Sequence, residues 1–60
     1  MPFEMILELT PEVNDFRRMG DGSWFAYSTK LDETGLMIRY NAPTIRQALE
    51  GLRKNLGYAE

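Results

Sequence analysis

The chain has 60 residues, with no cysteine and no histidine. This length allows one domain, residues 1–60, and it excludes a disulfide framework and the usual zinc sites as sources of stability. Hydrophobic residues make up 43% and charged residues 27% of the chain, with a formal charge of −2, which indicates a folded globular protein and argues against non-specific binding of nucleic acid.

The N-terminal residues alternate in the manner of a strand. Every second residue from position 3 to position 9 is apolar: Phe3, Met5, Leu7 and Leu9. A period of two is expected where one face of a strand is buried, so we predict a strand over residues 3–9.

The following segment, residues 11–19, has two interpretations. Thr10 and Pro11 have the order of an N-cap and a first-turn proline, which favours a short helix. Asn14 and Asp15 favour turns instead, and then the segment is an ordered loop anchored by Phe16.

Two strands joined by a short loop are predicted next, over residues 23–31 and 36–41. If residues 32–35 form a four-residue loop, Tyr27 pairs with Tyr40. The apolar side of this hairpin is then expected to face a helix, and it consists of Phe25, Tyr27, Leu36, Ile38 and Tyr40.

A C-terminal helix is predicted between Pro43-Thr44 and Gly57. Thr44 and Gln47 have the spacing of a capping box. Its apolar stripe comprises Ile45, Ala48, Leu49, Leu52 and Leu56. Gly51 borders this stripe, and either it permits close packing on the sheet or another helix, or it is a tolerated glycine.

Together these elements predict an α+β fold. A small antiparallel three-stranded sheet packs on one C-terminal helix, in the order β-α-β-β-α. The short first helix is the element for which a loop is the alternative.

The residue types present argue against catalysis. Without histidine and cysteine the chain lacks the commonest general base and nucleophile, so we expect no enzyme activity, no cofactor and no metal. The apolar runs are too short for a membrane span, and a chain without cysteine is compatible with the cytoplasm, where we expect this protein to act.

The sheet face opposite the helix is the candidate site. The residues expected to gather there are Trp24, Met37, Arg39, Lys30 and Ile6. Tryptophan and arginine are enriched at interface hot spots, and methionine adapts to varied partners. We therefore expect a small interaction module, such as an inhibitor or accessory factor, that binds a protein partner or a second copy of itself. In one alternative residues 10–22 cover this face, and in the other its aromatic and basic residues bind single-stranded nucleic acid.

The residues around the predicted helix start also resemble a known family. The run Asn41-Ala42-Pro43-Thr44-Ile45-Arg46-Gln47-Ala48-Leu49, which follows an antiparallel hairpin, resembles the strand-to-helix segment of the HicB-type antitoxin fold, over about residues 35–50. Gln47 stands where that family usually has an acid. The resemblance implies a β-rich sheet backed by a helix and an antitoxin-like role.

Overall fold

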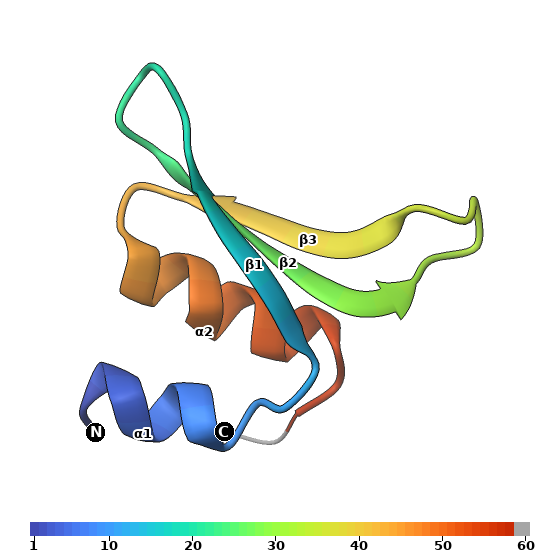
Figure 1. Cartoon of the computed structure of the whole chain (residues 1–60), viewed down its shortest axis with the longest axis horizontal. Helices are drawn as coiled ribbons and strands as arrows, with labels where there is room; N and C mark the ends of the chain where they lie inside the picture. The colour runs from blue at the N-terminus through green and yellow to red at the C-terminus, as the bar shows by residue number, and fades with distance from the viewer. Residues whose placement is uncertain (59–60) are drawn as a thin grey trace.

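A computed structural model describes residues 1–58 and contains two helices and a three-stranded sheet (Figure 1). Along the chain the elements are α1 (Phe3–Glu8), β1 (Val13–Arg18), β2 (Trp24–Leu31), β3 (Met37–Ala42) and α2 (Ile45–Asn55). The strands are antiparallel in the order β1-β2-β3, and both helices lie on the same side of the sheet (Figure 1). The predicted α+β class is confirmed, whereas the predicted order of elements is wrong, because the chain begins α-β rather than β-α.

Residues 3–8 form a helix and not the predicted strand. The residues of this segment that face the interior follow a helical spacing: Ile6 is buried, and the Phe3 ring lies 5.8 Å from the ring of Phe16. The Thr10 hydroxyl donates to the Ile6 carbonyl at 2.7 Å and so occupies an acceptor at the end of α1. The alternation at positions 3, 5, 7 and 9 was therefore misleading, since both periods fit so apolar a segment.

The segment for which we predicted a short helix or a loop forms β1. Its pairing with β2 shifts between Val13 and Asp15, which marks a β-bulge. The bulge allows Val13 and Phe16, three residues apart, to pack against the same core. A spacing of three is also that of a helix face, which explains the wrong prediction.

The turn between β2 and β3 is shorter than the sequence predicts. Gly35 has φ of +86°, its N–H donates to the Asp32 carbonyl at 3.1 Å, and the Asp32 N–H donates to the Leu36 carbonyl at 2.7 Å. This geometry is a three-residue loop over residues 33–35 with a left-handed glycine, and not the four-residue loop that we expected.

Beyond the shorter loop, an irregularity of β2 between Tyr27 and Leu31 shifts the pairing again, and the net change from the expected register is one residue. Ala26 pairs with Tyr40, and Tyr27 pairs with Arg39, so the predicted pair of Tyr27 with Tyr40 is wrong. A shift of one residue exchanges the two faces of a strand. Ala26 and Ser28 are fully buried as a result, and Phe25 and Tyr27 lie on the face away from the helices.

The helix α2 begins and packs as the sequence predicts. The Thr44 hydroxyl accepts from the Gln47 N–H at 3.1 Å. Ala48, Leu49 and Leu52 are fully buried, and Ala48 and Leu52 share a cluster with small residues of the sheet. Small residues on both sides let the helix approach the sheet closely.

Gly51 lies against the ring of Tyr40. A Cβ at position 51 would lie within 2.6 Å of three atoms of this ring. Of the two interpretations of Gly51, the structure supports close packing on the sheet.

Arg53 joins α2 to the end of α1. Its Nη1 donates to the Thr10 hydroxyl at 2.6 Å and to the Leu9 carbonyl at 3.2 Å. Within residues 1–58, neither helix has the length and apolar character that a membrane crossing requires.

Candidate functional site

An aromatic pair occupies the middle of the uncovered sheet face. Phe25 and Tyr27 project from β2 on the side opposite the buried Ala26, since successive residues of a strand face opposite ways. Their rings are stacked, with centroids 5.6 Å apart and planes inclined by 26°. Both helices lie on the other side of the sheet (Figure 1), so no helix covers the two rings, and each is half-buried.

Charged and amide side chains flank this pair on the two neighbouring strands. Phe25 lies between Arg17 and Asn41, and Tyr27 lies between Asp15 and Arg39. We call this surface the open-face strip, and its members are Asp15, Arg17, Phe25, Tyr27, Arg39 and Asn41. It crosses all three strands.

A shallow hollow lies at one end of the strip. It measures about 180 Å³ and is lined by Asn14, Asp15, Arg17, Tyr27 and Met37. The Asn14 side chain donates to the Met37 sulfur at 3.5 Å, which links the irregular part of β1 to β3. The strip therefore combines an apolar ridge with a small polar-rimmed depression.

The strip is locally basic although the chain is acidic. It holds Arg17 and Arg39 against the single carboxylate of Asp15, and in residues 1–58 the ion pairs join other groups, Lys30 with Glu12 and Arg46 with Glu50. Both arginines are exposed and, within residues 1–58, neither forms an ion pair, although the charge of Arg39 contributes to the lowered pKa of Asp32.

The perturbed carboxyl groups lie outside the strip and stabilise turns. The Ser23 hydroxyl and N–H lower the pKa of Asp21, and the Thr34 hydroxyl followed by the Leu36 N–H lowers the pKa of Asp32. These are the hydrogen bonds of short side-chain turns. Their geometry serves the turns and not proton transfer.

A third perturbed carboxyl joins the start of β1 to the chain after α2. The Tyr58 hydroxyl donates to Glu12 and lowers the pKa of Glu12, with Lys30 as the second cause, while the pKa of Tyr58 is raised by the same contact. This contact holds the C-terminal segment against the sheet.

The predicted site residues do not form one surface. Met37 and Arg39 lie on the open face as expected. Trp24 is half-buried on the helix side against the core, with Arg18 6.0 Å from its ring centre, and Ile6 is buried in α1. Lys30 forms an ion pair with Glu12 at 3.0 Å. The placement of Trp24 and Ile6 on the open face was wrong, because the register of β2 is shifted by one residue and residues 3–8 are helical.

Phe25, Tyr27 and Arg17 were missed as open-face residues. The signal that could have found them is Gly35 at the third position of the hairpin loop, where a left-handed glycine is typical of three-residue loops. That loop length would have given the observed faces of β2.

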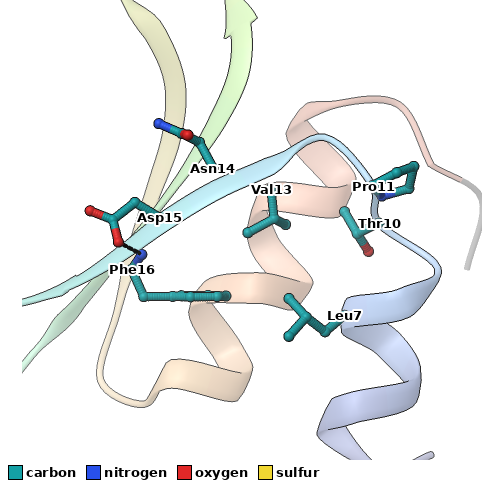
Figure 2. Close-up of a pocket in the computed structure, with 7 residues that line it drawn as sticks. All are labelled: Leu7, Thr10, Pro11, Val13, Asn14, Asp15 and Phe16. Atoms are coloured by element: carbon teal, nitrogen blue, oxygen red, sulfur yellow. Dashed lines mark hydrogen bonds between the residues drawn. The ribbon is translucent and has the colours of Figure 1, made fainter.

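A second, more apolar hollow lies beside β1 on the helix side. It measures about 460 Å³ and its lining residues are Leu7, Thr10, Pro11, Val13, Asn14, Asp15 and Phe16. Figure 2 shows Leu7, Val13 and Phe16 directed toward the space between α1 and β1. Four of these residues belong to β1, which is an edge strand of the sheet.

Among residues 1–58, no three acidic, histidine or cysteine side chains are placed together so that they could hold a metal ion. Comparison of the chain with protein-family models, with curated proteins and with solved structures found no match.

Proposed function

We propose that this protein is a small, non-catalytic interaction module that binds a protein partner through the open-face strip. The observation that carries the proposal is the stacked pair of Phe25 and Tyr27 on a sheet face that neither helix covers. A chain of this size has few large side chains with which to build a core, and it holds these two half-buried on the uncovered face.

The residue types of the strip suit a protein interface. Aromatic side chains bury 150–250 Å² each when fully covered, and tyrosine and arginine are over-represented at hot spots. Arg17 and Arg39 lie on either side of the ridge and can form bidentate pairs with carboxylates. The partner that fits has an apolar centre and acidic side chains beside it. An inhibitor, an antitoxin-like protein or an accessory factor of the cytoplasm would act through such a surface.

The test compares captured proteins between matched variants. Phe25→Ser/Tyr27→Ser removes the aromatic ridge, and Leu36→Ser removes an apolar side chain that is 55% exposed in the hairpin turn, away from the strip. Far-ultraviolet circular dichroism should show that both variants fold. We expect a specific partner to be retained by the wild type and the Leu36 variant and to be lost by the double variant. Equal retention by all three proteins would contradict the proposal.

Single-stranded nucleic acid is the second candidate ligand. The observation that favours it is the placement of two stackable rings between two arginines, since bases stack on aromatic faces while guanidinium groups contact phosphates. Fluorescence anisotropy with labelled oligonucleotides at low salt should show binding that weakens with salt and with Tyr27→Ala, by about 1–3 kcal/mol. An unchanged anisotropy at low salt would remove this candidate.

A further inference from the structure

The outer edge of β1 is an open strand edge. The Met19 N–H donates to the Ser23 carbonyl on the β2 side, and alternate residues of a strand direct their backbone groups to opposite edges. The backbone groups of Phe16 and Arg18 therefore point away from β2. Their carbonyls have no hydrogen-bond donor within residues 1–58.

The opposite edge of the sheet differs in this respect. The Arg39 side chain donates to the Met37 carbonyl at 3.2 Å, and the Asn55 side chain donates to the Arg39 carbonyl at 3.4 Å. Side chains thus occupy the carbonyls of Met37 and Arg39 at this edge, whereas the carbonyls of Phe16 and Arg18 in β1 can still accept another strand.

We propose that β1 pairs with β1 of a second copy of this chain, antiparallel about a two-fold axis at Phe16. The two sheets then form one continuous six-stranded sheet, and the two open-face strips lie side by side. The assembly is a feature of the fold in its own right and does not depend on the identity of the partner that the strip binds.

The charges along β1 select this register. A two-fold axis at Phe16 places Asp15 of each copy opposite Arg17 of the other copy, which gives two symmetric cross-strand ion pairs on the open face. Moving the axis to residue 15 would oppose two aspartates, and moving it to residue 17 would oppose two arginines. Axes between residues would bring opposite sheet faces together. Only the register centred on Phe16 is electrostatically self-complementary.

The same register satisfies the backbone. Phe16 faces Phe16 of the second copy as a hydrogen-bonded pair, and Asp15 faces Arg17 as a non-hydrogen-bonded pair, the type in which side chains lie closest. In the single chain the Asp15 carboxylate accepts from the Phe16 N–H at 2.8 Å (Figure 2). On pairing, the carbonyl of the second copy takes over this N–H and frees the carboxylate for Arg17.

The apolar hollow beside β1 lies where the second copy arrives. Its lining includes Val13 and Phe16 of β1, and a two-fold axis at Phe16 brings Phe16 of the second copy next to it.

Sedimentation equilibrium over about 10 μM to 1 mM tests the proposal, since an interface of this size is expected to be weak. The wild type should show a concentration-dependent rise from monomer to dimer mass. Asp15→Arg and Arg17→Asp each replace both attractive pairs by repulsive ones and should weaken dimerisation at least about tenfold. The Asp15→Arg/Arg17→Asp double variant restores the pairs in reversed order and should restore the dimer. Lys54→Asp, a charge reversal on the exposed face of α2, should leave the dissociation constant unchanged.

Two outcomes would overturn the pairing: a wild type that remains monomeric to the highest concentration, or a folded double variant that stays as weak as the single variants. These outcomes are separate from the capture experiment, because a monomer can still bind a partner through Phe25 and Tyr27.

Discussion

Substitution of Gly51 by alanine tests the packing of α2 on the sheet. In a helix interior, Gly→Ala is ordinarily stabilising by about 1 kcal/mol. Here the new Cβ would lie within 2.6 Å of three atoms of the Tyr40 ring, and carbon atoms pack at about 3.5–4.0 Å, so the ring must move by about 1 Å or more. The gain in helix propensity therefore stabilises the variant, while the displacement of the Tyr40 ring destabilises it.

The size of the opposing effect follows from the burial of Tyr40. Its residue is 40% exposed, so roughly 100 Å² of the ring is covered, and full displacement would cost up to about 2.5 kcal/mol at 25 cal/mol per Å². We expect Gly51→Ala to change the free energy of unfolding of the wild type by between about +0.5 and −1.5 kcal/mol. In a Tyr40→Ala background the ring is gone, and the same substitution should stabilise by about 1 kcal/mol.

Urea unfolding of the four proteins, followed by circular dichroism, gives the coupling energy between positions 40 and 51. A coupling of about 0.5–2.5 kcal/mol is expected, with Gly51→Ala more favourable when Tyr40 is absent. If Gly51→Ala stabilised both backgrounds equally, the ring would not lie over this glycine and the reasoning would be refuted.

Three further predictions concern stability. Leu52→Ala should cost about 2–5 kcal/mol in urea unfolding, because the side chain is fully buried; a cost below about 1 kcal/mol would contradict its place in the core. Thr44→Ala should cost about 1 kcal/mol through loss of the helix cap, and Thr44→Ser should retain most of it. The pKa of Glu12 is lowered by Tyr58 and then by Lys30, so the contribution of Glu12 to folding stability is present above the ordinary glutamate pKa and is lost as the pH falls through the folded pKa. Glu12→Gln should therefore reduce the loss of stability between neutral and acid pH in urea unfolding. An unchanged pH profile of stability would exclude this contribution.

The parts of the fold that the sequence predicted correctly are those with local chemical signals. The helix α2 has a capping threonine and an apolar stripe, and both are present in the structure. The hairpin was placed correctly along the chain but β2 was given the wrong faces, because the loop at Gly35 is one residue shorter than expected and an irregularity between Tyr27 and Leu31 shifts the register again. Local propensity does not distinguish two registers that differ by one residue, although the choice of register decides which face every side chain of the strand occupies.

The prediction for the N-terminal third of the chain was wrong for a different reason. Residues 3–8 are apolar on almost every side, so a period of two and a helical period both fit them. In β1 the bulge places Val13 and Phe16 on one face at a spacing that is typical of helices. In both segments the tertiary contacts of α1 and β1 with α2 and β2 decide the outcome, and those contacts connect residues far apart in the sequence.

The division between the two faces of β2 is the strongest argument that the open-face strip is functional. The side that faces α2 carries Trp24 at its start and the small residues Ala26 and Ser28 beneath the helix, while the uncovered side carries Phe25 and Tyr27, which are half-buried. A sequence under selection for stability alone would have the larger apolar side chains in the core, since burial contributes about 25 cal/mol per Å². The opposite arrangement leaves apolar area available for binding, and a module of marginal size retains its fold by packing α2 closely on small residues.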